Sequence, residues 1–209
     1  MKIPEELSPF SLVPKTGSIH LTNILKKLFK KKPLARNIAT NGYPIYIHRV
    51  ITMFIKCFDF IPYFWSEKNG EKKSEDYKVF NLKNPEMADL TNSIINSSTF
   101  FLYFISLGDC FHCGKAFINN FPCSLDEINL ETKNELVGLA KILMNDIKAN
   151  SVRRKANSAR TGKVEYDEFW VRHSKNILDN IDNFLSAHYG LSDEESGTTP
   201  VGRGMRKAP

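Results

Sequence analysis

The stretch NSSTFFLYFISLGDCFHCGKAFINNFP, residues 96–122, is the most apolar and aromatic part of the chain. From Phe100 to Leu107 nearly every side chain is large and apolar, so this segment is predicted to be buried over most of its surface. Gly108 and Asp109 interrupt the run, and four chemically active residues follow directly: Cys110, His112, Cys113 and Lys115. Residues 108–115 are called the corner below. A buried segment leads there into a polar turn that carries Cys and His, so the corner is either a metal or redox site or a surface that contacts a ligand.

The composition describes a folded chain with a modest positive charge. The chain has 209 residues, of which 42% are hydrophobic, and it includes 15 Phe, 7 Tyr and 2 Trp. This supply of apolar residues is ample for a packed core and excludes wholesale disorder, and the length fits one domain with appendages or two small domains. The net charge of +6, from 29 basic and 23 acidic residues, is compatible with a polyanionic partner.

No targeting or membrane segment is evident. The first residues, Met1-Lys-Ile-Pro-Glu-Glu, lack the apolar core of a signal peptide, and the longest apolar run falls short of the roughly 18 residues that a membrane span needs. Four cysteines in a chain of this length do not form the disulfide framework of a secreted protein. We therefore expect a cytoplasmic protein with no membrane partner.

Residues 1–40 form a basic N-terminal segment with few apolar groups. Its charge gathers around Leu25, Leu28 and Phe29, in the residues Lys26, Lys27, Lys30, Lys31, Lys32 and Arg36. A short basic amphipathic helix that touches phosphate is one interpretation, and a solvated helix face is the other.

Residues 41–128 are predicted to form a small sheet with packed helices. Alternation predicts strands at 45–50 and 74–82, joined through a charged hairpin tip at 68–73 with Asn-Gly at its centre. One helix is expected over 86–105, with Asn84 as its cap and Pro85 at its first position. Small polar residues on that helix permit close approach of another backbone. Residues 117–122 are expected to form a short strand that ends at Pro122.

Residues 129–191 are predicted to be a helical hairpin. Apolar periodicity predicts one helix over 131–149 and a second from about Ser174 that stops at Gly190. A polar, basic connection over 151–163 joins them. The tail, residues 192–209, is rich in Gly and Pro and is predicted to be disordered. The predicted fold class is therefore mixed α/β.

Motifs for chemistry are weak. Cys110 and Cys113 match C-x-x-C, but the second pair that a zinc site needs is missing, so structural cysteines are favoured over a metal or redox site. No G-x-S-x-G occurs, and Gly202-Arg-Gly204 lacks the strand and helix of a phosphate-binding loop. No catalytic residue is assigned, and whether the chain is an enzyme stays open.

Basic clusters give the best functional signal. Two of them are candidate phosphate clamps: the 68–73 tip with Lys72 and Lys73, and the 151–163 connection with Arg153, Arg154, Arg160 and Lys163. A solubilising surface is the alternative.

Five stretches carry a family resemblance: FDFIPYFW (58–65), KKSEDYK (72–78), INSSTFFLYF (95–104), GDCFH (108–112) and NNFP (119–122). In this order they resemble the C-terminal target-recognition region of type II adenine-specific DNA methyltransferases, the Eco57I-like and type IIG restriction–modification enzymes. The resemblance runs from about Asn41 to Glu195. It implies a target-recognition domain that reads double-stranded DNA, with His112 and Lys115 of the corner and Asn119 shortly after it as the DNA-facing residues.

The catalytic half of that family is absent from this sequence. Neither the glycine loop that binds S-adenosylmethionine nor the N-P-P-Y/F motif occurs, so this chain holds no cofactor and is not expected to methylate DNA alone. A separately encoded methylase or nuclease chain is the implied partner, and a fragment of a longer enzyme is the related expectation. Two alternatives stay open: a Cys/His metal-binding interaction module and a non-functional truncated gene product.

Overall fold

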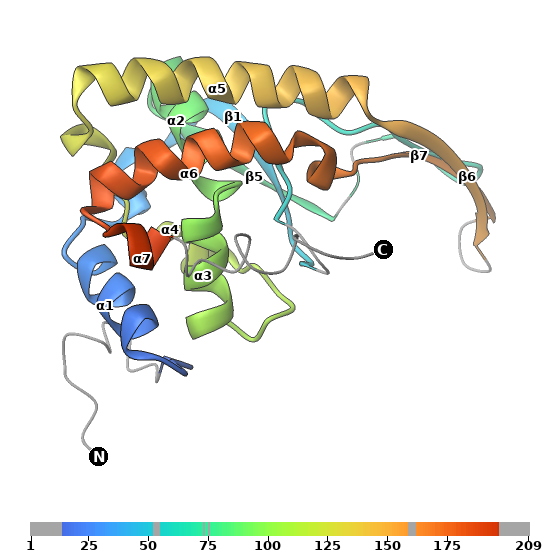
Figure 1. The fold of residues 1–209 in the computed structure, drawn as a ribbon. Coiled ribbons are helices and arrows are strands. Elements are labelled where there is room, and N and C mark those ends of the chain that lie inside the picture. The colour runs from blue at the N-terminus through green and yellow to red at the C-terminus, as the bar shows by residue number, and fades with distance from the viewer. Residues whose placement is uncertain (1–13, 52–54, 73, 75, 159–161, 197–209) are drawn as a thin grey trace.

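The computed structural model describes residues 14–51, 55–72, 74, 76–158 and 162–196. Within these ranges the chain has the predicted mixed α/β fold, with two small antiparallel sheets packed against helices (Figure 1). The strands are β1 (Ile38–His48), β2 (Cys57–Phe58), β3 (Phe64–Ser66), β4 (Gly70–Glu71), β5 (Tyr77–Leu82), β6 (Val152–Ser158) and β7 (Gly162–Glu168). The helices are α1 (Ile19–Leu28), α2 (Pro85–Ile95), α3 (Ser98–Leu107), α4 (Lys115–Asn119), α5 (Leu130–Ala149), α6 (Lys175–Tyr189) and α7 (Asp193–Ser196).

The first sheet has the strand order β2-β1-β5. Its long central strand β1 pairs antiparallel with β5, with Ile45 opposite Phe80 and Ile47 opposite Lys78. The two isoleucines are fully buried. At Gly42 the pairing shifts register, and a Cβ there would lie 2.1 Å from the carbonyl oxygen of Leu82. Only glycine fits this close approach, and it fixes how β1 crosses β5.

The second sheet has the order β4-β3-β7-β6, and it corrects the expectation for residues 151–163. That segment does connect the two helices, but most of it forms strand β6 and the start of β7, which were not predicted. Every residue of β6 whose burial is known is exposed, so the strand lacks the apolar alternation that reveals a strand in sequence. Within the predicted tip at 68–73, the turn from β3 leads into β4 at Gly70, whose φ is +67°, so the tip belongs to this second sheet, while Lys73 lies outside the described residues.

The helix expected over 86–105 is two helices, and the break at Asn96 and Ser97 has a clear cause. Ser97 Oγ accepts a hydrogen bond from Phe100 N at 3.2 Å and caps α3. The Asn96 side chain meanwhile bonds both the N–H and the C=O of Cys57, at 3.1 and 2.9 Å, so it continues the ladder of β2. Asn84 caps α2 as predicted. The predicted close approach is also confirmed, since Ser93 Oγ donates to the carbonyl of Leu136 on α5 at 2.8 Å.

The strand expected over 117–122 is wrong, because Lys115–Asn119 form helix α4. The aromatic residues of this segment serve the core rather than a sheet. Phe121 is fully buried, and its ring lies 4.8 Å from that of Phe100 and 5.1 Å from that of Tyr103, both on α3. Burial of these rings against α3 outweighs the short alternation seen in the sequence.

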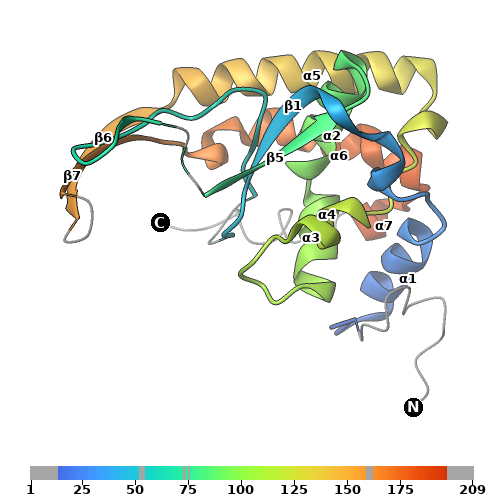
Figure 2. The same ribbon diagram turned by 180° about the vertical axis from the view of Figure 1, so that it is seen from behind.

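Helices α5 and α6 run antiparallel along one side of the molecule, as predicted for the helical hairpin (Figures 1 and 2). Gly190 ends α6 in the left-handed conformation, at φ +64°. The β6–β7 hairpin, which joins the two helices in the sequence, projects beyond both of them in the two views.

Both ends of the described chain are packed onto the body. In α1, Ile24, Leu25 and Leu28 are fully buried, so its basic residues lie on a docked helix. The expectation of a disordered tail is wrong for Asp193–Ser196, which form α7 with Glu195 buried. Residues 197–209, the rest of that tail, lie outside the described residues.

Candidate functional site

The corner is an ordered turn held by Asp109. Its carboxylate accepts hydrogen bonds from the backbone N–H of His112 at 2.6 Å and of Phe111 at 2.8 Å. It also contacts Nδ1 of His112 at 2.9 Å. The two backbone hydrogen bonds, followed by the one to the His112 side chain, lower the pKa of Asp109 to about 2. The Asp109 carboxylate therefore fixes the backbone of the corner, while the Phe111 and His112 side chains stay exposed.

Three hydrogen bonds to backbone groups of the corner fix its position. The N–H of Ile51 donates to the carbonyl of Phe111 at 2.9 Å, and the N–H of Cys113 donates to the carbonyl of Arg49 at 2.8 Å. On the other side, Lys15 Nζ donates to the carbonyl of Gly108 at 2.8 Å. The corner thus extends the sheet just after the end of β1.

The three DNA-facing candidates differ in exposure. His112 and Lys115 are exposed, and the Lys115 ammonium lies 5.8 Å from the Phe80 ring centroid. Asn119 is half-buried on α4, and its Oδ1 is buried without a hydrogen-bond partner among the described residues. Asn119 is therefore the least accessible of the three.

The candidate phosphate clamps on β6 are paired with carboxylates on β7. Arg153 contacts Asp167 through Nε at 2.6 Å, Arg154 contacts Glu168 at 2.8 Å, and a third pair joins Lys155 to Glu165 at 2.9 Å. Antiparallel register places Arg153 opposite Asp167 and Lys155 opposite Glu165, whereas Arg154 lies opposite Tyr166 and reaches Glu168 diagonally. All three basic side chains are exposed, so the pairs are weak interactions in water.

The remaining clamp residues have different settings. The guanidinium of Arg153 also lies 3.6 Å from the ring centroid of Tyr63, which fixes its plane. Lys163 is exposed on β7, and its backbone N–H donates to Glu67 beside the β3–β4 turn at 3.0 Å. Lys72 is half-buried, and its N–H donates to the carbonyl of Phe64 at 3.0 Å. Lys73 and Arg160 lie outside the described residues.

A cavity of about 330 Å³ separates the two sheets. The first sheet contributes His48 from β1, Lys56 beside β2 and Tyr77 from β5, and the second contributes residues of β3 and β7. Burial lowers the pKa of His48, and it lowers the pKa of Lys56 against the opposing effect of the Glu168 carboxylate. Sequence analysis missed these residues, because the β7 part of the lining lies about 90 positions beyond Tyr77 in the chain.

The cysteines do not converge on a metal site. Cys110 is exposed, whereas Cys57, Cys113 and Cys123 are buried, and burial raises the pKa of Cys113 and of Cys123 to about 12. Among the described residues, no three His, Cys, Asp or Glu side chains are grouped so as to hold a metal ion.

Comparison of the chain with protein-family models, with curated proteins and with solved structures finds no match. The resemblance to adenine-specific methyltransferases therefore stays an expectation from the five quoted stretches. No helix in the described part of the chain has the length and apolar character needed to cross a membrane.

Proposed function

We propose that the chain is a DNA-recognition module of the adenine-methylation or restriction type, and that it contacts the duplex through the β6–β7 hairpin. The observation that carries this proposal is the projecting hairpin (Figure 1), whose exposed strand β6 has the three consecutive basic residues Arg153, Arg154 and Lys155. A two-stranded β-ribbon of this kind fits the major groove of DNA, and its basic residues set the register on the phosphates.

Charge supports the same surface. Residues 152–168 carry five basic and three acidic residues, and Lys68 adds positive charge where the β3–β4 turn meets β7 at Lys163. The acidic partners keep the free protein's arginines folded back onto β7. Phosphate must replace those carboxylates, so the expected affinity is modest and falls steeply with salt.

Base reading is assigned in this proposal to the corner, where His112 and Lys115 are exposed. Their donors and acceptors are of the kind that reads base edges. Because no S-adenosylmethionine loop or N-P-P-Y/F motif occurs in the sequence, a separate catalytic chain would carry out any methylation or cleavage.

The test is the binding of a labelled duplex of mixed sequence, measured by fluorescence anisotropy across a salt series. The Arg153→Ser/Arg154→Ser double variant is expected to weaken binding about ten-fold and to reduce the salt slope by about 2. The matched control is Lys83→Ser/Lys141→Ser, which removes the same charge from exposed residues away from the hairpin. Binding that does not fall with salt, or equal losses in both double variants, would show that the hairpin is not the DNA surface.

A further inference from the structure

A row of three polar side chains crosses the first sheet at the cavity. His48 on β1 is paired with Tyr77 on β5, and on its other side its N–H donates to the carbonyl of Lys56 at 2.9 Å. Neighbouring positions in a ladder point to the same face, and all three residues line the cavity. The His48 ring packs edge-on to the Tyr77 ring at 4.9 Å between centroids. One wall therefore presents an ammonium, an imidazole and a phenol in a line.

The facing wall is aromatic. Phe64 on β3 is paired with Tyr166 on β7, and both line the cavity together with Tyr63 and Phe169. These rings and Tyr77 give the space planar apolar surfaces on both sides. At about 330 Å³ the cavity has the size at which small-molecule sites begin, roughly 300 Å³.

The charges lining the cavity are compensated, with one exception. Asp167 is paired with Arg153 and Glu168 with Arg154, while Asp76 accepts from Arg49 Nε at 3.2 Å. The side-chain ammonium of Lys56, in contrast, forms no hydrogen bond or ion pair with any residue that the structure describes, although it is more than half buried and only the charge of Glu168 acts on it from a longer distance. A half-buried ammonium without a hydrogen-bonding partner is costly, and an anion in the cavity would offset that cost.

His48 adds a second polar group with a defined role. Its Nδ1 lies 2.5 Å from the carbonyl oxygen of Val50, and so short a contact with an oxygen requires the proton on Nδ1. The Val50 N–H also approaches Nδ1, but at 3.3 Å. Nε2 is then an acceptor with no partner among the described residues, and it belongs to a ring that lines the cavity.

We infer that the cavity between the two sheets binds a small molecule that carries one planar ring and one anionic group. The ring lies between Tyr77 and the aromatic residues of β3 and β7, the anionic group pairs with Lys56, and a hydroxyl or amine of the ligand donates to His48 Nε2. This site does not depend on DNA binding by the hairpin, so each proposal fails or stands without the other.

Two probes represent the two sources of such chemistry: 4-hydroxybenzoate for a free aromatic acid and adenosine 5′-monophosphate for a nucleotide. Each is titrated into the ¹⁵N-labelled full chain by NMR, beside its ring-only analogue (4-hydroxybenzyl alcohol or adenosine) and its anion-only analogue (acetate or inorganic phosphate). At least one probe is expected to bind more tightly than both of its analogues, and to shift the amides of His48, Tyr77 and Tyr166 selectively.

Two variants test whether the Lys56 ammonium binds the anionic group of the probe. Lys56→Gln is expected to weaken binding of that probe about ten-fold or more. Lys78→Gln is the matched control, because Lys78 follows Tyr77 on β5 and therefore points to the opposite sheet face, near Cys113. It is expected to leave the affinity within about two-fold. Shifts spread over the surface, no preference for either probe over its analogues, or equal affinities of wild type and Lys56→Gln would overturn the inference.

Discussion

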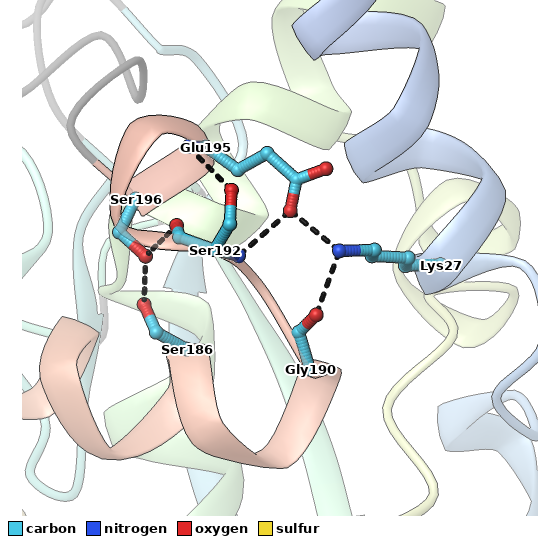
Figure 3. Close-up of polar contacts among 6 residues, drawn as sticks. All are labelled: Lys27, Ser186, Gly190, Ser192, Glu195 and Ser196. Carbon is cyan, nitrogen blue, oxygen red and sulfur yellow. Dashed lines mark hydrogen bonds and ion pairs between the residues drawn. The ribbon is translucent and has the colours of Figure 1, made fainter.

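The ammonium nitrogen of Lys27 lies 2.6 Å from Oε2 of Glu195 and so joins the helix nearest the start of the described chain to the one at its end (Figure 3). The same ammonium donates to the carbonyl of Gly190 at 2.7 Å. Ser192 and Glu195 bond each other reciprocally, with Ser192 N–H to Oε2 at 2.8 Å and Glu195 N–H to Ser192 Oγ at 3.3 Å. This capping box starts α7, and Lys27 ties it to α1.

Glu195→Ala is expected to lower the free energy of unfolding by about 2 kcal/mol, because it leaves the Lys27 ammonium without its carboxylate and the Ser192 N–H without its acceptor at the start of α7. Urea unfolding followed by circular dichroism measures this. Asp193→Ala, in the same short helix but exposed, is the control and should change stability by about 0.5 kcal/mol or less. Equal effects of the two substitutions would show that the Lys27 contact contributes nothing.

The Glu195 contribution also depends on pH. Burial opposes ionisation, but the hydrogen bonds from Lys27 and Ser192 outweigh it and lower the pKa of Glu195. A carboxyl whose pKa is lower in the folded state stabilises above its unfolded pKa and loses that effect as the pH falls. The stability difference between wild type and Glu195→Ala is therefore expected to shrink between pH 7 and pH 3. A difference that stays constant would contradict the lowered pKa.

Asp182 on α6 is expected to change stability with pH in the opposite direction, because its pKa is raised rather than lowered. Its carboxylate accepts hydrogen bonds from the backbone N–H and the hydroxyl of Ser98, the first residue of α3. Burial nevertheless raises the pKa of Asp182 to about 6, above its unfolded value of about 3.9. The folded chain then holds a proton that the unfolded chain has lost, so stability falls as the pH rises from about 4 to about 6, by up to about 3 kcal/mol.

Asp182→Asn removes the titrating group and keeps an oxygen that accepts from Ser98. The variant is expected to lack this fall, which urea unfolding at pH 4.5 and pH 7 compares directly with wild type. Asp193→Asn, which removes an exposed carboxyl on α7, is the control. Parallel pH profiles of wild type and Asp182→Asn would show that Asp182 titrates as an ordinary exposed carboxyl.

The α2–α5 contact gives a prediction from packing. Ser93 is fully buried, and its hydroxyl bonds the α5 backbone at Leu136, so the two helices approach closely at this point. Ser93→Leu would place a large side chain between them and is expected to cost about 3 kcal/mol, whereas Ser93→Ala loses one hydrogen bond, worth about 1 kcal/mol. Thermal unfolding measures the stability of both variants. A Ser93→Leu variant as stable as Ser93→Ala would show that α2 and α5 are not closely packed at this point.

The elements that sequence predicts correctly are those whose own periodicity or caps specify them. α5 and α6 have apolar stripes, Asn84 caps α2, and Gly190 ends α6. Strand β6 could not be predicted, because its exposed residues show no pattern and it exists through its pairing with β7. The break at Ser97 depends on Asn96 bonding a strand about 40 positions away.

The candidate site also has a part that the sequence predicts and a part that it does not. The sequence locates the basic residues of the hairpin, but not their acidic partners, because strand register alone places Asp167 beside Arg153. His48 and Lys56 could not be selected from sequence, since isolated His and Lys residues are common and the cavity appears only when the two sheets face each other.

The pairing on the hairpin leads to a prediction that ordinary charge removal does not test. Asp167→Asn frees Arg153 from its carboxylate without removing a basic residue, so under the proposed function it is expected to strengthen DNA binding by about three-fold at low salt. Asp179→Asn removes one negative charge too, but its partner is Lys175 on α6, so it corrects for the change in net charge. Anisotropy with the same duplex measures both variants. A gain of equal size in the two would assign the effect to net charge, and a loss in Asp167→Asn would mean that the carboxylate holds Arg153 in the position that DNA requires.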